Sequence, residues 1–192
     1  MLYTLKNGNI LEVLQDESRE ADPRKWDNMT RMLCFHGKYK LGDQHLFYRQ
    51  SDYNSWEAMK ADIIKRENPA VIKPLYMYDH SGISIGTNNT TYPFDCQWDA
   101  GQIGYVFITK AVPYVEYNCK RITAKIRVKL EGILEDEVKL YNQYLSGDVY
   151  GFIEKDAEGV EVNSCWGFYG SDPKENGMLE HLSSEIGYKI FG

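Results

Sequence analysis

The amino-acid sequence predicts an α+β fold with a mostly antiparallel sheet, and three observations support this prediction. Short apolar segments come in pairs around turn signals, as 2–5 and 10–14 do around Asn7-Gly8. The segment 122–145 carries apolar residues every three or four positions, which is typical of an amphipathic helix. Strands and helices do not alternate regularly, so we expect hairpins packed by one long helix and two or three shorter helices. The length of 192 residues favours a single domain over 1–192.

Cap and turn signals predict the shorter helices. Asn54 with Glu57 three residues later indicates the start of a helix, which Asn68-Pro69 ends. Asp172-Pro173 opens a predicted final helix, because Asp favours the cap and Pro the first helical position. Gly147 stands where the C-terminal cap glycine of the long helix belongs.

The remaining strands are expected between polar turns. They cover 71–85 as two strands around a turn, 102–109, and 148–154 with 160–168 as a hairpin. After Asp22-Pro23 the pattern allows two interpretations, a helix that starts at the proline or a strand over 30–36.

Charge and composition limit the partners that the chain is expected to bind. The formal net charge is -6, and no run of Lys and Arg is longer than two residues. Direct nucleic-acid binding is therefore not expected, since nucleic-acid-binding proteins carry a basic patch or stripe. The densest basic stretch, 120–129, alternates with apolar residues and is interpreted as the solvent-facing side of a helix. An acidic chain instead presents carboxylates to a basic partner, such as a protein whose nucleic-acid channel it occupies.

No apolar stretch approaches the roughly 20 residues that span a bilayer, so membrane insertion is not expected. The first residues lack the basic flank and apolar run of a signal peptide. The four cysteines are widely spaced and form no CxxC pair, which favours reduced thiols in the cytoplasm.

Polar residues that could carry chemistry gather in three stretches, 34–45, 79–82 and 95–102. A zinc site is one interpretation, with His36, His45 and His80 as ligands and a water in the fourth position. The spacing of these residues matches no zinc motif, so a metal is not favoured, and no cofactor is expected.

A hydrolase is a second interpretation, through a His/Asp metal site or a cysteine nucleophile. Cys96 or Cys34 would need a base such as His80 or His36 and an orienting carboxylate such as Asp79. The catalytic candidates in that case are His80, Asp79, Cys96 and Asp99. No local signature of a cysteine protease is present, so catalysis stays uncertain and a non-enzymatic role is favoured.

A structural role for these residues is the third interpretation and the favoured one. Cysteine is among the most buried residue types, and Asp before Gly or Ser builds turns. The tryptophans are expected to fill the core: Trp26, Trp56, Trp98 and Trp166.

Four carboxylates cluster on the long predicted helix: Glu131, Glu135, Asp136 and Glu137. They are candidates for contact with a basic partner. A solvated helix face carries the same pattern, and that interpretation is favoured.

Several motifs follow one another in order between about 22 and 170. They are DPRKWDN at 22–28, CFH at 34–36, LGD at 41–43, PLYMYDHSG at 74–82, WDAGQIG at 98–104, YLSGDVYG at 144–151 and SCWGFYG at 164–170. Together they resemble a family of uncharacterised proteins encoded by bacteriophages and mobile elements. The resemblance implies a small phage accessory protein in the host cytoplasm and transfers no catalytic residue. Phage proteins of this size and charge often inhibit host defence, as anti-CRISPR and anti-restriction proteins do.

Three functions are therefore expected in this order. The first is a non-enzymatic protein-binding inhibitor of a host defence nuclease, which would form a stoichiometric complex. The second is a hydrolase that uses the polar stretches above. The third is a structural or regulatory phage protein, which would assemble through its long helix.

Overall fold

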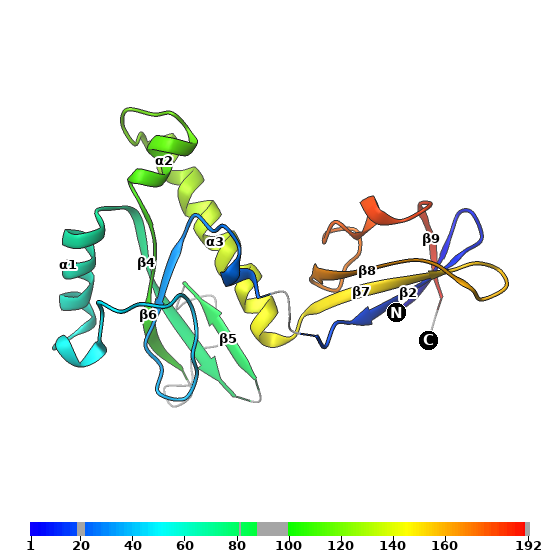
Figure 1. Cartoon of the computed structure of the whole chain (residues 1–192), viewed down its shortest axis with the longest axis horizontal. Coiled ribbons are helices and arrows are strands. Elements are labelled where there is room, and N and C mark those ends of the chain that lie inside the picture. Colours follow the sequence, from blue (N-terminus) through cyan, green and yellow to red (C-terminus); the bar gives the residue numbers. More distant parts are fainter. Residues whose placement is uncertain (19–21, 81, 88–99, 191–192) are drawn as a thin grey trace. The chain divides into compact units, whose positions relative to one another are not determined.

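The computed structural model describes residues 1–18, 22–80, 82–87 and 100–190, and it confirms the α+β fold (Figure 1). The chain divides into two compact units. Unit 1 comprises Met1–Asp22 and Gln143–Gly192, and unit 2 comprises Pro23–Asn142. Each unit has its own antiparallel sheet and is described by itself. The expectation of a single domain over 1–192 stays a prediction.

Unit 1 is a five-stranded antiparallel sheet with the strand order β8-β7-β2-β1-β9. Its strands are β1 (Leu2–Leu5), β2 (Ile10–Gln15), β7 (Val149–Lys155), β8 (Glu161–Tyr169) and β9 (Ile186–Ile190). The two predicted hairpins, β1–β2 and β7–β8, are confirmed. Gly8 has a φ of 91°, a left-handed conformation that glycine adopts without steric cost, and this explains the tight first turn.

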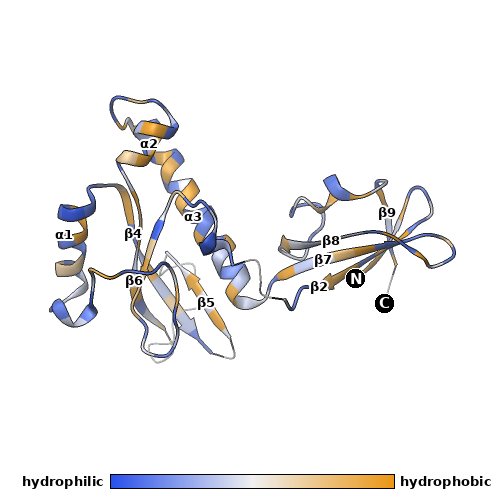
Figure 2. Ribbon diagram, viewed as in Figure 1, coloured by the Kyte–Doolittle hydropathy of each residue, from blue (hydrophilic) through white to orange (hydrophobic). Residues whose placement is uncertain are grey.

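Alternation along the strands places one face of this sheet in the core of unit 1. Leu11 and Val13 of β2 pack with Phe152 of β7 and Phe168 of β8. Met178 covers this cluster from the segment that follows β8. Figure 2 shows hydrophobic residues along these strands. The alternating burial along β2 and β7 is therefore the periodicity of a half-buried sheet.

A fully buried carboxylate, Glu154, joins three segments of unit 1. Its oxygens accept hydrogen bonds from Asn9 Nδ2 (2.5 Å), from the Ser183 backbone N–H (3.2 Å) and from the Ser183 hydroxyl. Burial raises the pKa of this carboxyl, but the hydrogen bonds from Ser183 and Asn9 outweigh burial and lower the pKa from its ordinary value. Glu154 is therefore a charged structural residue.

The predicted final helix is wrong. Asp172 instead closes a turn by accepting hydrogen bonds from Glu175 and Asn176, and Gly177 then adopts a φ of 83° that interrupts any helix. A single 3-10 turn, η3 (Met178–His181), follows, and the chain then enters β9. β9 pairs with β1, so contacts between the two ends of the chain override the local helix signal.

Unit 2 is a four-stranded antiparallel sheet with the order β3-β6-β4-β5. Its strands are β3 (Arg31–Cys34), β4 (Pro69–Asp79), β5 (Ile83–Gly86) and β6 (Ala100–Thr109). Its helices are η1 (Pro23–Lys25), η2 (Gln50–Asp52), α1 (Trp56–Glu67), α2 (Ala111–Glu116) and α3 (Ala124–Ser146). α1 and α3 lie on opposite sides of the sheet, and the unit boundary falls within α3 (Figure 1).

One helix covers each face of this sheet. On one face, Met59 and Ile63 of α1 pack against Leu33, Tyr105 and Phe107. On the other, the long helix buries its apolar stripe: Leu130, Leu134, Val138 and Tyr141. Side-chain bonds fix α3 there, because Asn142 accepts from the backbone N–H of Ile85 (2.7 Å). The predicted long helix and its sheet packing are confirmed.

The ends of the helices differ in detail from the prediction. The residue that caps α1 is Ser55 rather than Asn54, since its hydroxyl accepts from the backbone N–H of Ala58 (3.2 Å). Asn68 ends α1 in a left-handed conformation, which asparagine adopts more readily than most residues other than glycine. For the segment after Asp22-Pro23 the sequence allowed either a helix or a strand. The structure contains a single 3-10 turn that starts at Pro23 and then the strand β3. α2 was not predicted.

Among the described residues, no helix combines the length and the apolar composition needed to cross a lipid bilayer.

Candidate functional site

Two of the predicted site residues line one cleft at an end of the unit 2 sheet. The cleft has a volume of about 330 Å³. β3 leads into it with Phe35 and His36, β4 contributes Met77 and Asp79, and the start of β6 contributes 100–103. Antiparallel pairing of β4 with β6 and of β3 with β6 brings these segments together although they are far apart in sequence.

The wall of this cleft is polar. Asp79 accepts hydrogen bonds from the Tyr39 hydroxyl (3.2 Å) and from Lys38 Nζ (3.4 Å). The His36 ring stacks on Tyr39, with ring centroids 5.2 Å apart and planes 11° from parallel. Its Nδ1 atom is buried and has no hydrogen-bond partner among the described residues. The cleft is therefore suited to binding a polar group.

The three histidines proposed as zinc ligands do not form a metal-binding group. Both ring nitrogens of His45 face backbone carbonyl oxygens, Nε2 that of Cys34 (3.0 Å) and Nδ1 that of Tyr48 (3.1 Å). His80 is exposed, at the end of β4. Among the residues that the structure describes, no three His, Cys, Asp or Glu side chains are placed to hold a metal ion.

Cys34, one of the two candidate nucleophiles, is not suited to that role. Cys34 is buried, and burial together with the nearby Asp43 carboxylate raises the pKa of its thiol to about 12. At neutral pH this side chain is a protonated core residue rather than a nucleophile. Cys96 and Asp99 lie outside the described residues.

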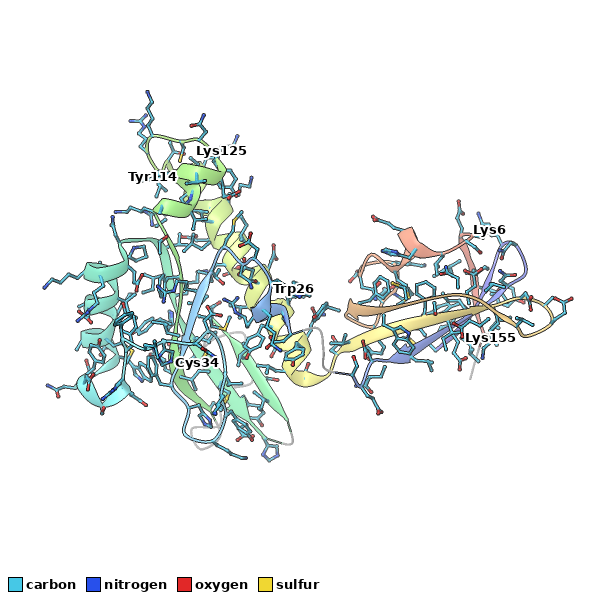
Figure 3. The ribbon with its side chains drawn as sticks, in the orientation of Figure 1. Lys6, Trp26, Cys34, Tyr114, Lys125 and Lys155 are labelled. Atoms are coloured by element: carbon cyan, nitrogen blue, oxygen red, sulfur yellow. The ribbon has the colours of Figure 1, made fainter. Side chains whose placement is uncertain are left out.

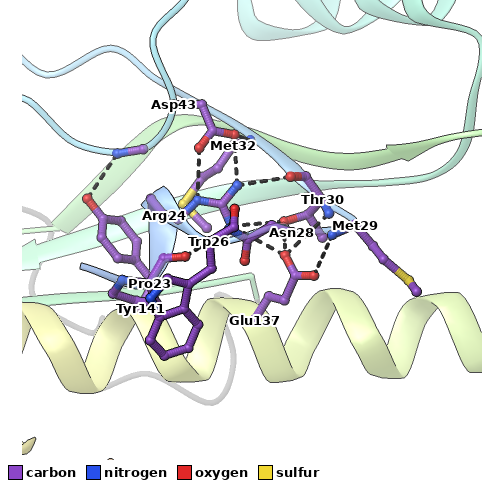
Figure 4. A network of polar contacts seen from close by, with 11 residues as sticks. Pro23, Arg24, Trp26, Asn28, Met29, Thr30, Met32, Asp43, Glu137 and Tyr141 are labelled. Carbon is purple, nitrogen blue, oxygen red and sulfur yellow. Dashed lines mark hydrogen bonds and ion pairs between the residues drawn. The ribbon is translucent and has the colours of Figure 1, made fainter. Parts of the chain in front are cut away.

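Arg24 is the centre of a buried polar network in unit 2, shown in Figure 4. Its side chain is 4% exposed, and its guanidinium donates to both oxygens of Asp43 (2.9 and 2.7 Å) and to the Thr30 carbonyl (2.9 Å). Burial lowers the pKa of Arg24, but the carboxylates of Asp43 and Glu137 outweigh burial and raise it. The bidentate pair fastens the turn before β3 to the loop after it.

The predicted acidic partner surface on α3 is partly used inside the molecule. Glu137 accepts hydrogen bonds from the Met29 backbone N–H (2.9 Å) and from the Thr30 hydroxyl (2.5 Å). Glu135 forms an ion pair with Lys73 of β4. These two carboxylates hold α3 against the sheet, and the other two members of the set remain on the helix surface: Glu131 and Asp136.

The expectation that the tryptophans fill the core is wrong for two of them. Trp26 and Trp166 are each about half exposed, at 49% and 47%. Trp166 lies on the edge strand β8, where its indole covers Gly151, a position without a side chain. Trp56 is half-buried and packs near Phe35, and Trp98 lies outside the described residues.

An exposed apolar pair lies in a loop of unit 2. Leu46 is 88% exposed and Phe47 is 79% exposed, and both belong to the loop between β3 and η2. Two adjacent large apolar side chains in water are unusual unless they contact a partner. The sequence signal is an apolar pair in a polar segment that has neither helical nor strand periodicity, and our sequence analysis missed it.

The loop that carries this pair is braced on both sides. The ring nitrogens of His45, just before the pair, face the Cys34 and Tyr48 carbonyl oxygens. The centroid of its ring lies 4.5 Å from that of Phe35, and Phe35 also lines the cleft. Tyr48, just after the pair, is buried, and its hydroxyl donates to Glu67 of α1 (3.0 Å). Leu46 and Phe47 therefore project from a fixed base.

Charge is distributed unequally between the two units. Unit 1 contains five Lys and Arg against 14 Asp and Glu, a formal net charge of -9. Unit 2 contains 17 against 14, a formal net charge of +3. The acidity of the chain therefore lies in unit 1, and the acidic set on α3 belongs to the basic unit.

No protein-family model, curated protein or solved structure matches the chain.

Proposed function

We propose that this protein acts by binding another protein, through the Leu46–Phe47 pair. The observation that carries the proposal is the pair itself, which is almost fully exposed on a braced loop. Interface anchors are large apolar side chains, and a fixed base lowers the entropy lost on binding. The histidine of the loop and the arginine network serve the fold.

The partner class that we propose is a host defence nuclease, of the CRISPR or restriction type, in the host cytoplasm. The acidic unit 1 supports a basic partner, because a formal charge of -9 attracts positively charged surfaces and speeds association. The surfaces with which nucleases bind nucleic acid are positively charged, so they would attract unit 1. The resemblance to phage-encoded proteins supports the same partner class.

The proposal is tested with Leu46→Asp/Phe47→Asp in hosts that each carry one restriction or CRISPR system. We expect the wild-type chain to raise the plating efficiency of a targeted phage against at least one system. The double variant should lose this protection, because losing two interface anchors weakens binding by at least about 30-fold.

The matched control is Val160→Asp/Val162→Asp, which places the same charges on two exposed valines of unit 1. This variant should keep the protection. The proposal fails if the wild-type chain protects against none of the systems, or if Leu46→Asp/Phe47→Asp protects as well as the control.

A further inference from the structure

A basic surface occupies one end of unit 2, formed by α2, the loop after it and the first turns of α3. Residues 110–129 contain six Lys and Arg and one acidic residue, Glu116, a formal charge of +5 in a chain of -6. We call 110–129 the basic end. Figure 3 places Tyr114 and Lys125 together at this end. The basic residues are Lys110, Lys120, Arg121, Lys125, Arg127 and Lys129.

The fold holds the basic end together as one surface. Lys129 Nζ of α3 lies 4.2 Å from the centre of the Tyr117 ring, directly after α2. The Cys119 thiol contacts the Pro113 carbonyl and folds the intervening loop back on α2. The sequence shows 120–129 as its densest basic stretch, and the folded loop brings α2 beside it.

The carboxylates that the structure describes leave most of these charges unneutralised. Four of the six side chains are exposed and form no ion pair with a described carboxylate: Lys120, Arg121, Lys125 and Lys129. The other two donate to uncharged oxygens, Lys110 to Asn68 Oδ1 and Arg127 to the Ala70 carbonyl. The positive charge at this end is therefore available to an external anion.

The placement of these charges works against the stability of α3. Its first turn contains no acidic residue, although acidic side chains favour the start of a helix and cations disfavour it. Lys125 and Lys129 are four residues apart, so their like charges repel each other across one turn. The Tyr117 ring beside Lys129 and the Thr123 hydroxyl, which accepts from the Ile126 backbone N–H, are uncharged partners, and no described carboxylate pairs with Lys125 or Lys129. Charges that destabilise the start of a helix in this way are typical of functional surfaces.

Exposed apolar and aromatic side chains accompany the cations. Tyr114 is 42% exposed, Val115 78% and Val128 69%. A cationic surface with an accessible aromatic ring is typical of proteins that bind single-stranded nucleic acid, where the ring stacks on a base. A membrane surface fits less well, since α2 is only six residues long and the apolar stripe of α3 is buried against the sheet.

We propose that the basic end binds the phosphate backbone of nucleic acid without sequence preference. Lys120, Arg121, Lys125 and Lys129 would contact phosphates, and Tyr114 would stack on a base where the strand is single. This proposal replaces the sequence-based expectation of no nucleic-acid binding. It does not rest on the Leu46–Phe47 pair, so either proposal can fail alone.

The test is the fluorescence anisotropy of a labelled 30-nucleotide DNA, single-stranded or as a duplex, titrated with the full chain. Four phosphate contacts predict an affinity that falls about 100-fold between 50 and 200 mM salt. The variant Lys120→Glu/Arg121→Glu/Lys125→Glu should bind both DNAs at least about 10-fold more weakly at 50 mM salt. Tyr114→Ala should weaken binding of the single strand about 10-fold and leave the duplex unchanged.

The matched control, Lys40→Glu/Lys65→Glu/Lys139→Glu, changes the net charge equally at three exposed positions of unit 2 outside the basic end. It should bind DNA within about threefold of the wild type, and circular dichroism should show that all variants are folded. The proposal is overturned if the wild type does not bind DNA, or if both triple variants lose binding equally. Binding to phosphatidylserine vesicles without binding to DNA would also overturn it.

Discussion

Arg24→Met is expected to lower the free energy of unfolding of unit 2 by about 3 kcal/mol. The substitution removes the buried guanidinium and leaves the Asp43 and Glu137 carboxylates, 22% and 16% exposed, without their shared cation. Breaking a buried ion pair costs about 3–5 kcal/mol, and the lower value applies because both carboxylates keep some contact with water. Urea unfolding, followed by tryptophan fluorescence, measures the change.

The control for this variant is Arg66→Met. Arg66 forms an ion pair with Asp62 one turn away on α1, and its side chain is 57% exposed. Removing an exposed pair of this type costs no more than about 0.5 kcal/mol. Equal stability losses for the two variants would contradict the structural role of the buried network in holding the turn before β3.

Gly104→Ala is expected to destabilise unit 2 by at least about 3 kcal/mol. A Cβ atom on Gly104 of β6 would lie 1.8 Å from the Leu33 carbonyl oxygen and 2.9 Å from its carbonyl carbon. Both are backbone atoms of β3, so relief requires separating the paired strands. Because β3 leads directly into Phe35 and His36, the same separation would also open the cleft.

Gly101→Ala is the matched control, since Gly101 lies on the same strand and an added Cβ meets no atom within 4 Å. Urea unfolding of the two variants in parallel should give a wild-type midpoint for Gly101→Ala and a much lower one for Gly104→Ala. A wild-type midpoint for both would show that β3 and β6 do not approach each other as described.

Local signals were sufficient to predict much of the fold. The Asn7-Gly8 turn, the β7–β8 hairpin and the long apolar stripe of α3 each follow from residues close together in sequence. The predicted final helix failed because β9 pairs with β1 from the opposite end of the chain. Pairing over such a distance leaves no trace in local periodicity.

The candidate site was predictable only in part. His36 and Asp79 were named from their polar surroundings, and they do line one cleft. His45 was named as a zinc ligand only in an unfavoured alternative, and only the folded loop shows that its two ring nitrogens face backbone carbonyl oxygens. The exposure of Leu46 and Phe47 depends on the tertiary structure, since an apolar pair in a sequence is ordinarily buried.

Inhibition by binding, as proposed for this protein, is tested most directly by stoichiometry. The nuclease complex from the defence system that the plating assay identifies is purified and titrated with the chain, and DNA cleavage is measured. The proposed function predicts that cleavage falls linearly and stops at a fixed molar ratio, with the mass of both proteins unchanged. Inactivation of many nuclease molecules by one chain, or a covalent change in the nuclease, would contradict it and indicate an enzyme.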